Sequence, residues 1–533
     1  MAAQSLGHAF QASARQYAGQ AAIIADGEPL DYLALGRQSD AFAAALAGLG
    51  VSKGDRIGLY CMNCPFFVIA YLGILKAGAV VVPINLLISQ SEMAFILHDA
   101  GAKVLVHHVA FTAQAALLQS AVGSLACTVN MGGAGNMIEI MHPLLLGGGR
   151  VMAQQPVTWD ELLHTAAPPP SIEHDPQQDL AVILYTSGTT GKPKGAMLTH
   201  GNLLANVASV QQAMQWRPGG DTVLVVLPMF HAFAATVGLL TPLLYGCAIV
   251  PVPRFEPELV AKTIHETRAT IFLGVPSMFT VLLRLKPERA QWLESLRFCI
   301  SGGAALPVEI LRRFEEQFGK KIYEGDGPTE CGPVTCVNPI GGLSKPGTVG
   351  LPIPGVEMRI IGEEGLATLP IGEVGEIAVR GANVMKGYWN LPEATAESFR
   401  GGWFLTGDLG TEDEDGYFSI VDRKKDLVIV NGMNVYPRMI EEALYRYAPI
   451  NEAAVVGEPN DLHGEIPVAY VSLIAGAEAT EADIRAYCRE HLGRHQVPRK
   501  IHILPELPKN ATGKILKREL RKQGEVERGV IDL

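Results

Sequence analysis

The segment Tyr185-Thr-Ser-Gly-Thr-Thr-Gly-Lys-Pro-Lys-Gly195 follows directly on Leu180-Ala-Val-Ile-Leu184, an apolar run typical of a buried strand. Glycines let backbone N–H groups approach an anion closely, and hydroxyl and ammonium groups complete an anion-binding cradle. A flexible surface loop has a similar composition, but the strand before it favours a phosphate-binding loop. It is not a Walker A loop, because Pro193 follows Lys192 where that motif requires Ser or Thr.

Helical and strand-like segments alternate through most of the first 420 residues. The pattern predicts helices over Gln38–Leu49 and Phe66–Lys76, and strands over Arg56–Tyr60 and Val80–Pro83. Such alternation indicates an α/β fold whose parallel-sheet subdomains make up a large N-terminal domain.

One long uncharged stretch, Val223–Pro253, could be mistaken for a membrane span. Prolines and glycines divide it into short pieces, which predict a strand, a loop containing His231, a short helix and a second strand. We therefore expect a buried core unit and no integral membrane segment.

Composition narrows the class of protein. The 533 residues are too many for one ordinary core, and 48% apolar with 18% charged residues is typical of a globular protein. The net charge of −11, without a basic block, argues against nucleic acid as a partner. The eight cysteines show no zinc-site spacing, and the N-terminus shows no signal-peptide pattern, so we expect isolated buried thiols in a cytoplasmic protein.

A second, smaller domain is predicted at the C-terminal end. A Gly/Asp-rich segment over residues 401–416 leads to the charged run Asp422–Asp426, after which a new α/β pattern begins. Strands are expected near Leu427–Val430, Ala453–Val456 and Val468–Leu473, and Thr480 begins a helix with a capping box. The expected domains are residues 1–421 and a small, mobile α+β domain over residues 422–533.

Four further motifs follow in order. They are Ser301-Gly-Gly-Ala-Ala-Leu-Pro307, Tyr323-Glu-Gly-Asp-Gly-Pro-Thr-Glu330, Thr406-Gly-Asp408, and Pro508-Lys-Asn-Ala-Thr-Gly-Lys514. Taken singly, each has an ordinary reading as a tight turn, an Asx-turn or an exposed loop. With the phosphate loop, in this order and spacing, the chain resembles the adenylate-forming (AMP-binding) superfamily, and within it the acyl-CoA synthetases.

The resemblance implies an acid:CoA ligase that uses ATP, Mg²⁺ and coenzyme A. Its first step forms an acyl-adenylate and pyrophosphate, and its second forms an acyl-CoA thioester and AMP. The residues that would contact the phosphates of ATP are Thr186, Ser187, Gly188, Thr189, Thr190, Lys194 and, at the α-phosphate, Thr329. Glu330 would hold Mg²⁺, and Lys514 would bridge the carboxylate and the α-phosphorus.

The resemblance places the remaining site residues around the nucleoside, the acid and CoA. Gly302, Gly303 and Ala304 would border adenine, Asp408 and Arg423 would contact the ribose, and Lys425 would lie at the pivot between domains. His231 would lie beside the acyl pocket, although a lone histidine in apolar sequence is more often a core residue. Gly432 would let the backbone run beside the pantetheine arm of CoA.

Asp326 departs from the family pattern, which has an aromatic residue stacked on adenine at this position. We hypothesise that the Asp326 carboxylate accepts a hydrogen bond from the adenine N6 amino group, with Tyr323 as an alternative source of the missing ring. Losing a base–aromatic stack costs on the order of 1–3 kcal/mol in nucleic-acid binders.

The substrate is the least determined feature. His231–Gly238 is small, apolar and uncharged, which favours a medium- or long-chain fatty acid over an aryl acid. Ala234 and Gly238 would leave room for a chain or would serve helix packing. A free-standing enzyme that loads a carrier protein, a luciferase-like oxygenase and an inactive nucleotide-binding scaffold remain alternatives. The sequence does not distinguish a monomer from a homodimer.

Overall fold

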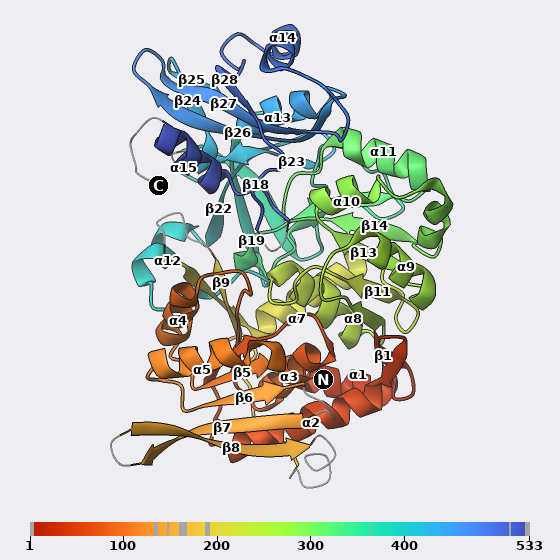
Figure 1. Ribbon diagram of the computed structural model, residues 1–533, viewed down its shortest axis with the longest axis vertical. Helices are drawn as coiled ribbons and strands as arrows, with labels where there is room; N and C mark the ends of the chain where they lie inside the picture. The colour runs from red at the N-terminus through yellow and green to blue at the C-terminus, as the bar shows by residue number, and fades with distance from the viewer. Residues whose placement is uncertain are drawn as a thin grey trace.

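The computed structural model describes residues 5–132, 137–146, 149–158, 168–186, 192–363, 365–510 and 513–527. Two nine-stranded sheets dominate its N-terminal part (Figure 1). The first has the order β17 (Leu351–Pro352), β16 (Cys336–Val337), β15 (Ile322–Asp326), β14 (Phe298–Ser301), β13 (Ile271–Gly274), β11 (Thr222–Val225), β12 (Ala248–Pro251), β1 (Ala21–Ala25), β2 (Glu28–Asp31). Its strands from β15 to β1 are parallel.

The second sheet has the order β20 (Gly387–Tyr388), β10 (Lys194–Thr199), β9 (Leu180–Thr186), β4 (Val80–Pro83), β3 (Arg56–Tyr60), β5 (Val104–His108), β6 (Cys127–Met131), β7 (Met137–Leu146), β8 (Gly149–Thr158). Strands β9, β4, β3, β5 and β6 are parallel, whereas β10 returns antiparallel beside β9. The α/β fold with parallel sheets, expected from the sequence, is confirmed.

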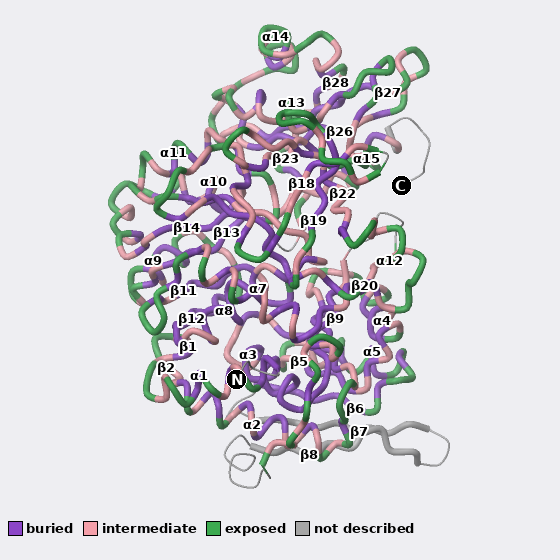
Figure 2. The backbone as a smooth tube through the Cα atoms, turned by 180° about the vertical axis from the view of Figure 1, so that it is seen from behind, coloured by how far each residue is buried: buried purple, intermediate pink, exposed green. Residues whose placement is uncertain are grey.

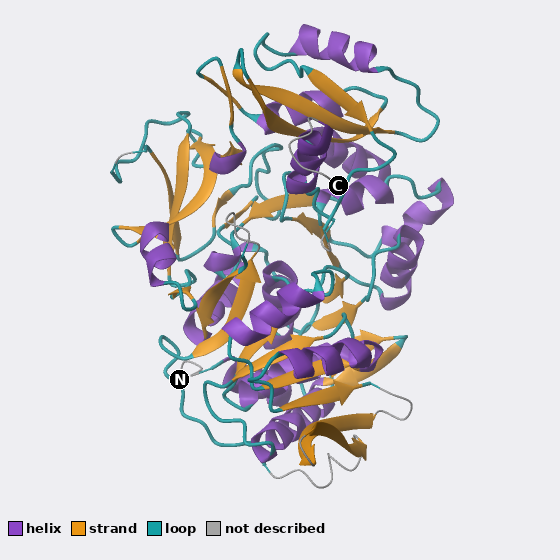
Figure 3. Ribbon diagram, turned by 60° about the vertical axis from the view of Figure 1, so that its left-hand side comes forward, coloured by secondary structure: helices purple, strands orange, loops and turns teal. Residues whose placement is uncertain are grey.

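Helices pack between and around these sheets (Figure 3). The helices of this part are α1 (Leu6–Gln16), α2 (Tyr32–Gly48), α3 (Pro65–Lys76), α4 (Gln90–Asp99), α5 (Thr112–Ala121), α7 (His200–Ala213), α8 (Thr241–Leu244), α9 (Pro257–Thr267), α10 (Pro276–Leu282), α11 (Val308–Phe318) and α12 (Pro392–Ser398). Residues 67–76 of α3 are all buried, and one hydrophobic core joins α3 to strands of both sheets (Figure 2). A second core lies under α4 and α5.

The helices and strands predicted for the first 100 residues are present, with small differences in their bounds. Strands β3 and β4 have the predicted bounds, but α2 begins at Tyr32, earlier than the predicted Gln38. The cause is Asp31, whose side chain caps the helix by accepting a hydrogen bond from the Ala34 N–H at 2.6 Å. The predicted start was based on the spacing of apolar residues, which gives no information about the capping residue Asp31.

The uncharged stretch is core, as predicted. Strands β11 and β12 pair in parallel, and the segment between them contains a π-helical turn, Ala234–Leu240, whose residues are all buried. In the described part of the chain, no helix is long and apolar enough to cross a membrane.

A third sheet precedes the C-terminal region. It contains β18 (Val356–Ile361), β19 (Gly375–Gly381), β22 (Trp403–Glu412), β21 (Phe399–Arg400) and β23 (Phe418–Arg423). The next sheet begins at β24 (Val428–Val430), beyond a 3₁₀ turn over Lys424–Asp426. The change of sheet therefore falls within the charged run identified in the sequence.

The smaller C-terminal domain has its own sheet and its own hydrophobic clusters. The sheet comprises β25 (Met433–Val435), β24, β27 (Gly464–Leu473), β26 (Ile450–Asn460) and β28 (Lys500–Ile503), with helices α13 (Pro437–Tyr445), α14 (Glu481–His491) and α15 (Lys517–Glu527). The capping box at Thr480 is present, because its side chain accepts from the Asp483 N–H and the Asp483 side chain accepts from the Thr480 N–H. The three predicted strands correspond to β24, β26 and β27.

The cysteines occur as free thiols, as predicted. They are not all isolated, because the sulfur atoms of Cys61 and Cys64 lie 3.6 Å apart in a hydrogen bond. Within the described ranges, no group of three or more His, Cys, Asp or Glu side chains could hold a metal ion.

Candidate functional site

A cavity of about 380 Å³ lies where the C-terminal domain meets the carboxyl ends of β14 and β15. This is the edge at which open α/β sheets bind ligands. Of the predicted site residues, six line it: Gly303, Ala304, Asp326, Asp408, Arg423 and Lys514, with Lys425 as a seventh at the domain junction. We call this cavity the interdomain cleft.

The loop after β14 forms one wall of the cleft. Gly303 has a φ of +78°, which favours glycine, and lines the cleft with Ala304. Gly302 lies behind them: an added Cβ would be 3.2 Å from the Phe233 ring, so a side chain here would press on that ring. The buried carboxylate of Glu324 fixes the loop by accepting a hydrogen bond from the Leu306 N–H at 2.8 Å.

Asp408 and Arg423 form the ion pair of the cleft. They lie opposite each other on β22 and β23, and the Arg423 Nε is 3.1 Å from the Asp408 Oδ1. Burial raises the pKa of Asp408, and the positive charge of Arg423 opposes this effect. The cross-strand register thus places an ionisable carboxylate with a guanidinium counter-ion inside the cleft.

Asp326 ends β15 and faces the same charges. Burial, followed by the negative charge of Asp408, raises the pKa of Asp326 to about 6. Tyr323 does not supply the ring missing at position 326. Its hydroxyl accepts from the Gly341 N–H at 3.0 Å, its ring packs edge-on to Phe298, and it does not line the cleft.

Lys514 reaches the cleft from the C-terminal domain. Its loop is fixed twice: the Asn510 Oδ1 accepts from the Lys514 N–H at 2.9 Å, and the Ser277 hydroxyl of α10 donates to the Gly513 carbonyl at 3.0 Å. Burial and then the positive charge of Arg423 lower the pKa of Lys514 to about 8. The ammonium group is therefore largely charged at neutral pH.

His231 lies near this lysine. Loss of solvation, followed by the positive charge of Lys514, lowers the pKa of His231 to about 4, so its imidazole is neutral at neutral pH. His231 is not among the residues that line the interdomain cleft. Gly238 does not provide room for a substrate chain, because an added Cβ would lie 3.1 Å from Val225 and 3.2 Å from Leu273. It serves packing of the π-helical turn on the sheet.

A second group of polar residues lies where β9 ends, at Thr186, and the neighbouring β10 begins, at Lys194. The Thr186 hydroxyl donates to the Lys194 carbonyl at 3.4 Å, which joins the two sides of the predicted phosphate loop. The predicted residues Ser187, Gly188, Thr189 and Thr190 lie outside the described residues.

Tyr388 links this group to the predicted metal ligand. The Lys194 Nζ lies 5.2 Å from the centre of the Tyr388 ring, and the Tyr388 hydroxyl donates to the Glu330 Oε1 at 2.8 Å. Burial raises the pKa of Tyr388, which keeps the hydroxyl protonated as a donor. Thr329 precedes Glu330 in the same 3₁₀ turn. Tyr388 was not identified as a site residue from the sequence. The only local signal is the pair of aromatic residues, Tyr388 and Trp389, that follows Gly387.

Gly432 lies apart from the cleft. It occupies the turn between β24 and β25 with a φ of +79°, is exposed and does not line the cleft. The arrangement seen here therefore brings Lys514, and not Gly432, to the interdomain cleft.

The chain is similar to known proteins along most of its length. A family model described as AMP-binding enzyme matches residues 10–389, and one described as AMP-binding enzyme C-terminal domain matches residues 439–514. The chain is 38% identical to a long-chain-fatty-acid–CoA ligase of Bacillus subtilis (strain 168), covering 95% of this chain and 92% of the relative. It is 35% identical to a feruloyl-CoA synthase of Amycolatopsis sp., covering 94% and 95%. The structure of ATP-bound MatB from Rhodopseudomonas palustris superposes with a TM-score of 0.85 at 31% identity, covering 97% and 99%.

Proposed function

Because the chain belongs to the AMP-binding enzyme family, we propose that this AMP-forming acyl-CoA ligase activates a medium- or long-chain fatty acid. A carboxylate oxygen attacks the α-phosphorus of ATP, and the bond to the β-phosphate oxygen breaks to release pyrophosphate. The CoA thiolate then attacks the acyl carbonyl, and AMP leaves with the electron pair of the broken C–O bond. The observation that carries this proposal is Lys514 in one cleft with Asp408 and Arg423.

In the first step, Lys514 acts as a point charge. Its ammonium group offsets the negative charge that develops between the attacking carboxylate and the α-phosphorus. Asp408 accepts hydrogen bonds from the ribose hydroxyls, with Arg423 beside it. Gly302, Gly303 and Ala304 present backbone to adenine, and Asp326 accepts from the adenine amino group.

The phosphates of ATP are assigned to the other polar group. Thr186 and Lys194, with Ser187, Gly188, Thr189 and Thr190 of the loop, would hold the β- and γ-phosphates, and Thr329 would contact the α-phosphate. A single carboxylate fits Mg²⁺, which takes most of its ligands from phosphate and water. Glu330 would hold the ion, oriented by Tyr388; bound Mg²⁺ neutralises phosphate charge.

The second step requires another arrangement of the domains. Gly432 would approach the pantetheine arm of CoA only after the C-terminal domain reorients, with Lys425 at the pivot. The proposed boundary between residues 421 and 422 falls in the segment that neither family model covers. The eight free thiols support a cytoplasmic location.

His231 would lie beside the acyl group as a neutral imidazole. Preference for a fatty acid over an aryl acid rests on the B. subtilis relative and on the apolar π-helical turn. The Amycolatopsis relative keeps an aryl acid as the second candidate.

The test is pyrophosphate release with Mg-ATP across fatty and aromatic acids, each with and without CoA. We expect turnover that requires CoA and is highest with a medium- or long-chain fatty acid. A maximum with an aromatic acid would support the second candidate, whereas a single stoichiometric burst that CoA does not turn over would contradict the ligase.

A further inference from the structure

A pair of cysteines lies where β3 ends and α3 begins. Cys61 follows the last residue of β3, and Cys64 precedes Pro65, the first residue of α3. We call residues 61–64 the cysteine turn. It belongs to the second nine-stranded sheet, in the parallel unit β3–α3–β4, and neither cysteine lines the interdomain cleft.

The two thiols are in direct contact. Their sulfur atoms lie 3.6 Å apart in a hydrogen bond, and among the described residues no other two cysteine sulfurs are hydrogen-bonded to each other. Two cysteines at this spacing beside a β–α–β unit are typical of dithiols that cycle between reduced and oxidised forms. Within the described ranges, no third His, Cys, Asp or Glu side chain joins them to make a metal site, which favours the redox interpretation.

The two thiols differ in reactivity. Cys64 is half-buried, whereas only 3% of Cys61 is exposed. The hydrogen bond with Cys61 lowers the pKa of Cys64, and the N–H groups at the start of α3 act in the same direction. Burial raises the pKa of Cys61. Cys64 is therefore the thiol that reacts with a dissolved electrophile, and Cys61 lies behind it.

Asn63 connects this turn to the other nine-stranded sheet. The side chain is buried, and its Oδ1 accepts from the Met229 N–H at 2.8 Å. Met229 lies two residues before His231, which the proposed function places beside the acyl group. The Asn63 Nδ2 donates to three carbonyls at the ends of β11 and β12, those of Val225 at 3.1 Å, Leu227 at 2.9 Å and Val252 at 3.2 Å.

Oxidation of the pair requires the cysteine turn to tighten. The S–S bond of a disulfide is about 2.05 Å long, so the two sulfurs must approach each other by about 1.5 Å. Asn63 lies between the cysteines in the chain and becomes part of the closed ring. Because hydrogen bonds weaken steeply with distance and angle, a shift of this size disturbs the contacts that Asn63 makes with the other sheet.

We propose that Cys61 and Cys64 are a redox-active dithiol, which a small disulfide of the glutathione type converts to an intramolecular disulfide. Formation of this disulfide withdraws Asn63 from the Met229 N–H and lowers the efficiency with which the enzyme uses its carboxylic acid. The second statement rests on the proposed function, whereas the first is independent of it.

The exchange takes two steps. The Cys64 thiolate attacks one sulfur of the oxidant, a Cys64–glutathione bond forms, and the other glutathione leaves with the electron pair of the broken S–S bond. The Cys61 sulfur then attacks the Cys64 sulfur, and the second glutathione leaves with the electron pair of the mixed disulfide. The two cysteine protons end on the two glutathione thiols. The dithiol thus loses two electrons, and one glutathione disulfide is reduced to two glutathione molecules.

The covalent test uses the full chain, incubated with glutathione disulfide or with dithiothreitol. The protein is then unfolded in N-ethylmaleimide and analysed by intact mass and peptide mapping. We expect all eight cysteines to be labelled after reduction, and all but Cys61 and Cys64 after oxidation, with these two joined. A wild-type protein that keeps eight labelled cysteines after oxidation would overturn the proposal.

Single variants separate the two thiols. Cys61→Ser should stop at the mixed disulfide on Cys64, and Cys64→Ser should remain reduced. Cys127→Ser is the matched control, because it removes another buried thiol, on β6, and should form the disulfide as the wild type does. A Cys64→Ser variant that still loses two labels would contradict the assignment.

The functional test measures ATP–pyrophosphate exchange without CoA, whose thiol would reduce the disulfide. Loss of one buried hydrogen bond corresponds to about tenfold, so kcat/KM for the acid should fall by about that factor on oxidation. The KM for ATP should stay unchanged, dithiothreitol should restore activity, and Cys64→Ser should not respond to the oxidant.

Two results would overturn the link through Asn63: equal kcat/KM for the acid in the oxidised and reduced wild type, or an equal rise in the KM for ATP. If the reduced enzyme activates no acid at all, the proposed function fails. The mass analysis then still decides whether the dithiol exists, so the two failures are distinguishable.

Discussion

Removing the ammonium group of Lys514 should separate the two half-reactions. Lys514→Ala deletes the one lysine that the C-terminal loop brings to the cleft beside Asp408. Loss of one group that stabilises developing charge costs on the order of 10²- to 10³-fold in rate. We therefore expect adenylation to fall by about that factor, while thioester formation from supplied acyl-adenylate stays within a few-fold of wild type.

The lowered pKa of Lys514 allows its role in adenylation to be tested a second way, through the pH dependence of kcat/KM. Because burial and Arg423 lower this pKa to about 8, the fraction of charged lysine falls about tenfold for each pH unit above 8. The value of kcat/KM for ATP reports the free enzyme, so it should show this descending limb. Lys514→Arg should move the limb to higher pH, because a guanidinium stays charged.

The assay is pyrophosphate release without CoA, and separately acyl-CoA formation from synthetic acyl-adenylate. Lys509→Ala is the matched control: Lys509 lies in the same loop and pairs with Glu452 at 2.6 Å, but Lys509 does not itself line the cleft. Equal losses in both half-reactions for Lys514→Ala would refute the assignment. So would a wild-type kcat/KM that shows no decline above pH 8.

Three further expectations follow from the site and its surroundings. Asp326→Ala should weaken discrimination of ATP against GTP, whose O6 the carboxylate would repel; an unchanged ratio of kcat/KM values would exclude the adenine contact. Tyr388→Phe removes the hydrogen bond to Glu330 and should raise the Mg²⁺ concentration needed for half-maximal adenylation about tenfold; an unaltered Mg²⁺ dependence would contradict this role. Burial and the neighbouring His174 lower the pKa of His200 to about 3, so the unfolded chain binds more protons below pH 6.5. Stability should fall between pH 6.5 and 3, by at most about 5 kcal/mol, and less steeply in His200→Gln, as measured by urea unfolding.

The sequence predicted those features that local chemistry determines. Strands β3 and β4 and the capping box at Thr480 each depend on a few adjacent residues, and each appears where expected. The start of α2 was placed too late because its cap, Asp31, belongs to the preceding strand. From the sequence, Gly238 could either leave room for a substrate chain or allow close helix packing. The short distances from an added Cβ to Val225 and Leu273 identify close packing.

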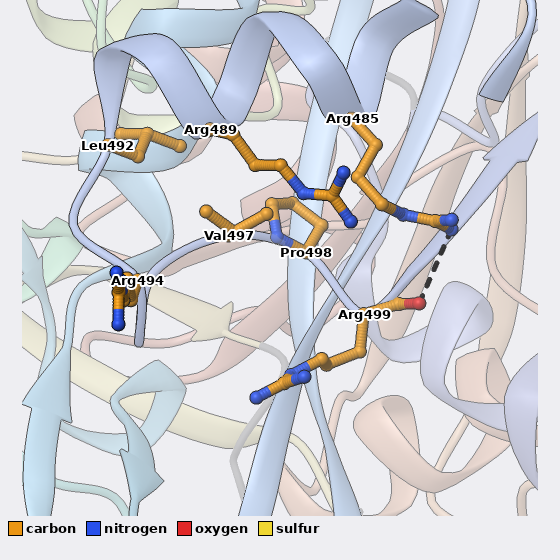
Figure 4. Close-up of a pocket in the computed structure, with 7 residues that line it drawn as sticks. All are labelled: Arg485, Arg489, Leu492, Arg494, Val497, Pro498 and Arg499. Atoms are coloured by element: carbon orange, nitrogen blue, oxygen red, sulfur yellow. Dashed lines mark hydrogen bonds between the residues drawn. The ribbon is translucent and has the colours of Figure 1, made fainter. Parts of the chain in front are cut away.

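Contacts between distant segments could not be predicted in the same way. Nothing near Tyr388 indicates that its hydroxyl reaches Glu330, because the contact arises when β20 pairs with β10. Another case is a cavity of the C-terminal domain that is lined by four arginines, Arg485, Arg489, Arg494 and Arg499 (Figure 4). Two are helical neighbours, but the other two join them only because the chain turns after α14 and returns into β28.

The charges around Asp326 suggest a second consequence of an acid at this position of the cleft. Asp326 and Asp408 are acids that share one small space, and both have a raised pKa. Their mutual repulsion is offset by Arg423 and by Lys514, and Lys514 comes from a loop that the Ser277–Gly513 hydrogen bond joins to α10. An aromatic residue at position 326 would add no charge to this balance. Asp326 therefore increases the attraction that draws Lys514 into the cleft, so the departure from the family pattern would favour the arrangement that forms the acyl-adenylate.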